Sequence, residues 1–271
     1  DDSLPLKHEK DTQVASLPPS LVEAVNAFVV ARAIRLLRGH ATQHCSMLIN
    51  VSRFTDVQRQ IRNEVHSRLE RIQASVRIYG ALPVSEAIRD VEIAALKAVF
   101  DKEYATACGF EWAAVQARLN DAAAPIKAVE VNSRSSGSLN YADHEKTGLS
   151  VIAVGGFSLS RGLTLEGLMI SYFLRNSVMY DTLMQMGRWF GYRPEYEDLC
   201  RVWMLDEAEG WYSHVADAVE ELREELRTME AANATPRQFG LKVRSDPLIL
   251  EVTARNKMGS GKTVTVQIGL A

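Results

Sequence analysis

The sequence predicts an α/β protein organised around a parallel β-sheet, and two kinds of pattern support that class. Short, nearly continuous apolar runs such as 45–51 are typical of strands that a sheet buries on both faces. Longer stretches such as 54–76 carry apolar residues at three- and four-residue steps, which indicates amphipathic helices. Because strands that alternate with helices pair in parallel, we expect helices on both faces of the sheet.

The elements begin with a polar, aperiodic linker over 1–19. A helix follows, with Ser20 as its expected N-cap and Gly39 as its end. The run at 45–51 is the first expected strand.

A long amphipathic helix comes next. Thr55 and Gln58 form a capping-box pattern at its start, and it ends near Gly80. The arginines along it give either a solvated face or a surface that contacts a phosphate backbone. They are Arg53, Arg59, Arg62, Arg68, Arg71 and Arg77.

The next region, 84–125, is expected to be a helical insertion that is divided near Cys108 and Gly109. Residues 132–148 are rich in Ser, Asn and Gly, which predicts an exposed loop. Four further strands are expected at 126–131, 149–154, 168–173 and 200–205.

Two helices complete the prediction, one from Val178 to Phe190 and one over 207–232. The tail, 234–271, has a mixed pattern that leans toward strand.

The composition is that of an ordinary globular protein. The chain has 271 residues, 46% of them hydrophobic, which is enough for one large domain or two smaller ones. With 31 Lys and Arg against 34 Asp and Glu, the net charge of −3 excludes a histone-like polycation but not a local basic face. No apolar run reaches the roughly 18–20 residues of a membrane span, and the polar start is unlike a signal peptide. We therefore expect a cytoplasmic protein with no membrane partner.

The three cysteines, Cys45, Cys108 and Cys200, are far apart and odd in number. This argues against a disulfide framework and against a structural zinc module. His40, His44 and Cys45 have a helix-like ligand spacing, but a glycine precedes them and no carboxylate is close in sequence. We predict no metal site in the chain.

Two segments carry the most chemistry. In 155–168 a strand ends in small residues, and a hydroxyl, an arginine and glycines follow before the next strand. Loops at strand ends expose backbone N–H groups that can bind anions. In 185–193 a glycine, Gly187, accompanies the guanidinium groups of Arg188 and Arg193. Guanidinium is the preferred partner for a phosphate whose charge grows during phosphoryl transfer.

These segments resemble motifs V and VI of the second RecA-like lobe of superfamily-two helicases. The run SRGLTLEGL at 160–168 matches motif V, and QMGR at 185–188 matches the core of motif VI. The longer string QMGRWFGYR at 185–193 is similar to that of the Z-one domain proteins, which accompany restriction and phage-defence systems. The resemblance spans residues 20–258 and is most specific over 155–206.

The resemblance implies a RecA-like parallel sheet with helices on both faces, a helical insertion and a mainly helical C-terminal extension. The implied parts are a linker (1–19), two pieces of the lobe (20–83 and 126–206), the insertion (84–125), and the extension with its tail (207–271).

The implied function is that of one lobe of a bacterial, ATP-dependent DNA translocase or helicase-like subunit in a restriction system. Such a lobe is inactive alone, because ATP and Mg²⁺ are held mainly by an N-terminal lobe. The implied partners are double-stranded DNA, a nuclease subunit and that N-terminal lobe.

The resemblance also assigns roles to single residues. The catalytic set is Arg188, Arg193 and Gln185, and the nucleotide-binding set is Gly162, Thr164 and Glu166. The set that contacts the nucleic-acid backbone is Ser52, Arg53, Ser158, Ser160 and Arg161. The hydroxyls of this region could equally be simple turn caps.

The chain departs from the motif patterns at three points. Thr164 replaces the usual motif V aspartate, and Gly191 replaces the second motif VI arginine, so Arg193 takes over that role or Arg188 acts alone. No phosphate-binding G-x-x-x-x-G-K-[ST] loop with a D-E box is present. The tail segment GSGKT at 259–263 has Asn256 where the first glycine belongs and predicts a flexible turn. We therefore expect the nucleotide-cradling lobe to lie outside this chain.

Two other classes of function remain as alternatives. The helix 207–232 combines an apolar stripe with glutamates at 220, 221, 224 and 225, so it either packs on a core or docks a separate nuclease subunit. In the second case the chain is an adaptor without ATP turnover. An intrinsic endonuclease would need a Glu-x-Lys pair, and the nearest segment, Glu130-Val131-Asn132, has Asn in place of Lys.

Overall fold

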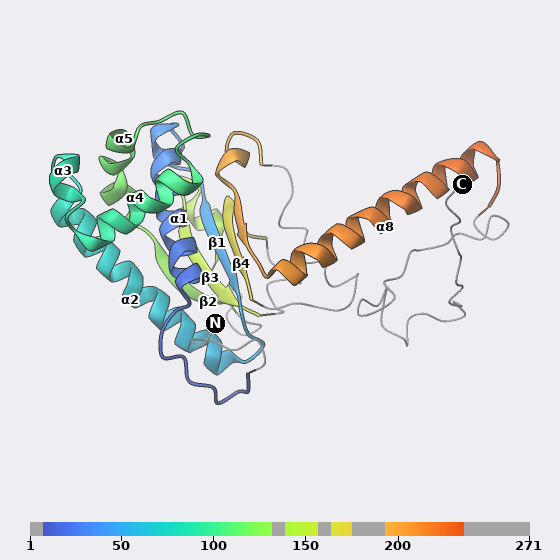
Figure 1. The fold of residues 1–271 in the computed structure, drawn as a ribbon, viewed down its shortest axis with the longest axis horizontal. Helices are drawn as coiled ribbons and strands as arrows, with labels where there is room; N and C mark the ends of the chain where they lie inside the picture. The colour runs from blue at the N-terminus through green and yellow to red at the C-terminus, as the bar shows by residue number, and fades with distance from the viewer. Residues whose placement is uncertain (1–7, 132–138, 157–163, 175–192, 236–271) are drawn as a thin grey trace. The chain divides into compact units, whose positions relative to one another are not determined.

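The predicted α/β class is confirmed by a computed structural model that describes residues 8–131, 139–156, 164–174 and 193–235 (Figure 1). Its sheet has five strands in the order β2-β3-β1-β4-β5, and each pair of neighbouring strands is parallel. The strands are β1 (Cys45–Asn50), β2 (Lys127–Val131), β3 (Ser150–Gly155), β4 (Leu168–Phe173) and β5 (Arg201–Trp203). This arrangement is consistent with a RecA-like lobe.

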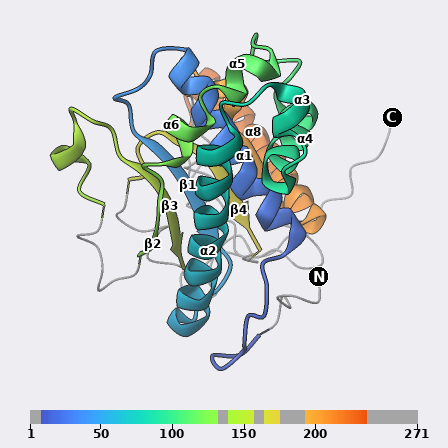
Figure 2. The same ribbon diagram turned by 90° about the vertical axis from the view of Figure 1, so that its left-hand side faces the viewer.

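Helices α1 (Pro19–Leu37) and α2 (Thr55–Tyr79) cover one face of the sheet and are the two longest helices described in its compact unit. Helix α1 contacts β4 and β5, whereas α2 contacts β2 and β3. Figure 2 shows both helices in front of the strands. The strand residues that share their core are Met47, Ile49, Ile152, Val154, Ile170 and Tyr172.

Strand residues that point to the opposite face, such as Leu48, Val151 and Ala153, are also buried. Burial on both faces is what a continuous apolar strand requires. The helix expected from Val178 to Phe190 lies outside the described residues.

The insertion folds back onto the first two helices. It contains α3 (Val84–Ala87), α4 (Val91–Glu103), α5 (Trp112–Gln116) and α6 (Leu119–Ala123). Helices α4 and α6 contact both α1 and α2 and share their core. The expected helices are therefore present, in shorter pieces than the sequence predicted.

Both predicted helix caps are wrong. The N-cap of α1 is Pro18, and the Ser20 hydroxyl lies 2.9 Å from the Tyr172 hydroxyl on β4. The N-cap of α2 is Phe54, which makes no side-chain cap bond, and Gln58 donates instead to the carbonyl of Ser52. Ser20 therefore has a partner distant in sequence, and Gln58 bonds to the turn that precedes its own helix.

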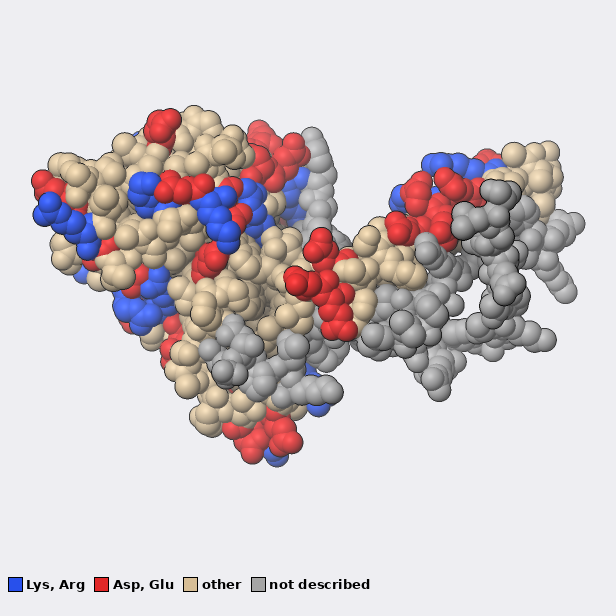
Figure 3. All heavy atoms as spheres, in the orientation of Figure 1, with Lys and Arg blue, Asp and Glu red and all other residues tan. Residues whose placement is uncertain are grey.

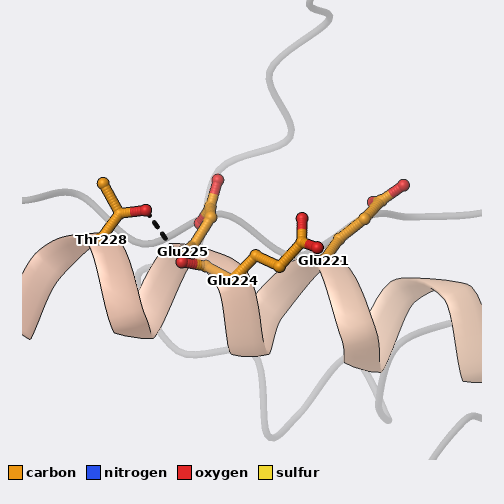
Figure 4. A pocket seen from close by; sticks show the side chains of 4 residues that line it. All are labelled: Glu221, Glu224, Glu225 and Thr228. Carbon is orange, nitrogen blue, oxygen red and sulfur yellow. Dashed lines mark hydrogen bonds between the residues drawn. The ribbon is translucent and has the colours of Figure 1, made fainter.

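Helix α8 (Asp206–Ala231) belongs to a second compact unit. Its apolar stripe includes Val215 and Ala218, which are buried, whereas Leu226 remains 38% exposed. Acidic side chains gather along this helix in Figure 3. In Figure 4 Glu221, Glu224 and Glu225 lie side by side, and the Thr228 hydroxyl donates to the Glu224 carbonyl at 2.9 Å.

The tail beyond residue 235, including 259–263, lies outside the described residues. Among the helices that the structure describes, none is long and apolar enough to cross a membrane.

Candidate functional site

The strand register gathers three strand ends at one edge of the sheet, which we call the carboxyl edge. Asn50 at the end of β1 pairs with Gly155 on β3 and with Phe173 on β4. Ser52 and Arg53 follow β1 directly, and the segments 157–163 and 175–192 follow β3 and β4. The carboxyl edge is therefore where both motif-bearing segments leave the sheet, beside Ser52 and Arg53.

Ser52 is buried at the carboxyl edge, with only 1% of its surface exposed. Its hydroxyl accepts the N–H of Phe54 at 3.0 Å and lies 2.8 Å from Nε2 of His8. Its carbonyl accepts from Nε2 of Gln58 at 2.9 Å. Ser52 thus fixes the turn into α2 rather than offering its hydroxyl to solvent.

Arg53 is the exposed member of the predicted pair. Its guanidinium carbon lies 4.7 Å from the centre of the Phe54 ring, a cation–π distance. An aromatic ring that supports an arginine leaves its N–H groups available to an anion.

Gly156 allows the chain after β3 to pass close to this turn. A Cβ at this position would lie 2.7 Å from Nε2 of Gln58 and 2.8 Å from the carbonyl oxygen of Ser52. Any larger residue would push the start of the motif V segment away from Ser52, so a glycine is required here.

The sequence reasoning missed two polar residues at the carboxyl edge, Asn50 and Gln58. Each is 3% exposed, and within the described residues Oδ1 of Asn50 and Oε1 of Gln58 have no hydrogen-bond partner. A buried acceptor of this kind points to a bound water or ligand group. In the sequence each of them could be noticed only as a side-chain amide among apolar residues of a buried strand or helix face.

Glu166, in contrast, lies at the opposite end of the sheet, which we call the amino edge. Its carboxylate is 3.7 Å from Nε2 of His44, and its carbonyl accepts from the Ser46 hydroxyl at 2.7 Å. Ser46 pairs with Leu168 where β1 and β4 begin. Thr164, the other described member of the nucleotide-binding set, is exposed.

Arg193 also lies at the amino edge, shortly before β5. Its carbonyl accepts the N–H of Tyr196 at 3.4 Å, and the guanidinium carbon of Arg35 lies 4.2 Å from the Tyr196 ring centre. Burial raises the pKa of Tyr196, while the charges of Arg35 and Arg193 oppose that rise. Arg35 donates to the carbonyl of His44 at 2.7 Å, which joins this group to the start of β1.

The described members of the predicted sets lie at different edges of the sheet. Glu166 and Arg193, assigned to nucleotide chemistry, lie at the amino edge, and Arg53, assigned to nucleic acid, lies at the carboxyl edge. A strand of this length separates the two edges by roughly 20 Å. The remaining predicted residues, Ser158, Ser160, Arg161, Gly162, Gln185 and Arg188, lie outside the described residues.

The predicted arginine-rich face of α2 is partly committed to contacts within the protein. Arg68 is buried and pairs with Glu92 on α4, and Arg71 lies 3.7 Å from the same carboxylate. Arg59 pairs with Asp56 in the first turn of α2. The face that could reach a phosphate backbone is therefore narrower than the sequence suggested.

The amino edge carries both acidic and basic side chains. Across the residues that the structure describes, no three His, Cys, Asp or Glu side chains converge as metal ligands. His40 and His44 turn to different carboxylates, Glu195 at 3.8 Å and Glu166 at 3.7 Å. Arg35 and Arg193 add positive charge at this edge, and Arg35 is buried with its terminal N–H groups bonded within the protein.

Fold and edges together define an α/β protein that presents polar groups at both ends of a parallel sheet. The Z1 domain family model matches residues 20–250, so the chain belongs to the Z1 domain family. No curated protein and no solved structure matches the chain.

Proposed function

We propose that this chain is the second RecA-like lobe of an ATP-dependent DNA translocase or helicase-like subunit in a restriction system. Membership of the Z1 domain family supports this proposal. The observation that carries it is the separation of Glu166 and Arg193 from Arg53 across the length of the sheet. A lobe that meets nucleotide at one edge and DNA at the other can convert lobe closure into movement along DNA.

Arg193, which lies at the amino edge, and Arg188 are both proposed to direct their guanidinium groups to a phosphate held by an N-terminal lobe. A guanidinium placed on the transferring phosphoryl group neutralises charge that develops in the transition state. Gln185, Gly162, Thr164 and Glu166 would line the same side. ATP with Mg²⁺, when bound mainly by the other lobe, supplies the phosphoanhydride bond that is hydrolysed.

At the carboxyl edge, Arg53 is proposed to contact the DNA backbone together with Ser158, Ser160 and Arg161. Such contacts give affinity without sequence preference. Ser52 acts indirectly, because its buried hydroxyl and carbonyl hold the turn that presents Arg53.

The experiment uses a full-length protein that carries this chain and a nucleotide-binding lobe. We expect Arg188→Ala to abolish DNA-stimulated ATP hydrolysis while DNA binding is retained. Arg53→Ala should weaken DNA binding and lower the slope of affinity against salt by about one. The matched control is Arg59→Ala in α2, the helix that begins just after Arg53, because the Arg59 side chain already pairs with Asp56. Full-rate hydrolysis by the Arg188→Ala protein would overturn the proposal.

A second candidate function is an adaptor that recruits a nuclease subunit without ATP turnover. It is favoured by the exposed glutamates of α8, Glu220, Glu221 and Glu224, because an acidic face repels DNA and suits a basic protein surface. Deletion of 207–271 should then abolish capture of the nuclease subunit in a pull-down. Unchanged capture would remove this role from α8 and the tail.

A further inference from the structure

The segment 193–200, which joins Arg193 to β5, contains a strained residue. Glu195 has φ of 76°, in the left-handed region that a side chain with a Cβ rarely adopts. Such a conformation persists only when the surrounding contacts determine it, and it is common near functional groups. Glu195 lies two residues after Arg193, so its backbone sets the direction in which the chain leaves that arginine.

Arg38, just after the end of α1, stabilises this conformation through hydrogen bonds to both Glu195 and Asp198. Its guanidinium donates to the two carboxylate oxygens of Asp198 at 2.8 and 2.5 Å. The same group donates to the carbonyl of Glu195 at 3.0 Å. A bidentate arginine fixes orientation as well as distance, so Arg38 fixes the backbone between Glu195 and Asp198.

Arg35, one turn earlier on α1, contacts the same segment at Tyr196. It is 1% exposed, stacks under the Tyr196 ring and donates to the carbonyl of His44. Burying a guanidinium costs desolvation free energy unless hydrogen bonds and nearby opposite charges compensate for it. Those contacts join the segment after Arg193 to the start of the central strand β1.

We propose that Arg35 and Arg38 are positioning residues for Arg193, which hold the strained turn at Glu195 so that the Arg193 guanidinium reaches the phosphate in a fixed geometry. This inference rests on the proposed function. A displacement of about 1 Å at a group that acts on the transition state can cost about 100-fold in rate. The effect should therefore appear in kcat and not in the binding of ATP or DNA.

The test measures ATP hydrolysis by the full-length protein that carries this chain. We expect Arg38→Ala to lower kcat by about 10- to 100-fold with KM for ATP within about threefold and DNA affinity unchanged. Asp198→Asn, which keeps the shape of the side chain, should lower kcat in the same way, and Arg38→Lys should recover part of it. The matched control is Lys102→Ala, which removes an exposed ion pair between α4 and Glu23 of α1.

Three outcomes separate the ideas. Loss of activity in Arg193→Ala and Arg188→Ala, with wild-type kcat in Arg38→Ala and Asp198→Asn, overturns the positioning role alone. Wild-type kcat in Arg193→Ala overturns the positioning inference, and wild-type kcat in Arg188→Ala overturns the proposed function. If Arg38→Ala does not fold, Asp198→Asn and Arg38→Lys decide the question, because equal kcat in both and in the wild type contradicts the inference.

Discussion

Arg68 on α2 and Glu92 on α4 form an ion pair in the interior, where the residues are only 7% and 8% exposed. A second guanidinium nitrogen of Arg68 donates to the side-chain oxygen of Asn26 on α1 at 3.0 Å. One arginine therefore connects α1, α2 and the first long helix of the insertion. The contact adds a polar link to the apolar core that α4 shares with α1 and α2.

The first prediction concerns the stability that this pair confers. Glu92→Ala leaves the Arg68 charge buried with its main partner removed, and we expect a loss of about 3 kcal/mol in the free energy of unfolding. The double variant Arg68→Met with Glu92→Leu should lose much less, because both charges leave the interior together. Urea unfolding at pH 7 measures both. The control, Lys97→Ala, removes an exposed pair with Asp101 and should cost less than about 1 kcal/mol; an equal cost for Glu92→Ala would contradict the prediction.

The second prediction concerns Gly167, which has φ of 65° where the chain enters β4. A Cβ at this position would overlap the carbonyl oxygen of His44. Gly167→Ala should therefore shift the start of β4 and destabilise the protein by more than about 3 kcal/mol. Gly39→Ala is the control, since Gly39 also has a positive φ but a Cβ there would meet no atom within 4 Å, so only about 1–2 kcal/mol of backbone strain is expected. Comparable melting temperatures for the two variants would show that the contact with His44 is unimportant.

The third prediction concerns pH. The pKa of the Asp198 carboxyl lies below its ordinary value of 3.8, chiefly because Arg38 donates to it. Because the folded-state pKa is depressed, the stabilisation is complete well above pH 3.8 and is lost as the pH falls below that value. Thermal unfolding should show that the wild-type advantage over Asp198→Asn is constant from pH 7 to about 5 and decreases as the pH falls below 3.8. Asp56→Asn is the control on an exposed pair, and an Asp198→Asn difference that persists at low pH would refute the linkage.

The fourth prediction concerns thiol reactivity. Cys45 and Cys108 are 2% and 5% exposed, whereas Cys200 is only partly buried. Burial raises the pKa of the Cys45 and Cys200 thiols, which lowers the fraction of reactive thiolate. With a disulfide reagent at pH 8, one thiol should react slowly in the native protein, and Cys200→Ser should remove that reaction. The other two should react only in denaturant; rapid reaction of all three in native buffer would be inconsistent with this core.

Much of the fold could be predicted because its signals are local. The expected strand at 168–173 coincides with β4, and the run at 45–51 contains β1. A strand that is buried on both faces must be apolar throughout, so its position is visible in the sequence alone. The caps could not be predicted in this way, because the Ser20 and Gln58 side chains find partners that are distant in sequence or on the preceding turn.

The sequence by itself determined the α/β class and the places of the strands, and it predicted a set of site residues that stays a prediction. Only the tertiary structure decided which of those residues lie together. Glu166 and Arg193 are far from each other in sequence yet both lie at the amino edge, and Ser52, which looked available to a ligand, is enclosed beneath the turn that exposes Arg53. The physical reason is strand order: in a parallel sheet the residues before each strand lie at one edge and those after it at the other, but only the order β2-β3-β1-β4-β5 decides which of them are neighbours.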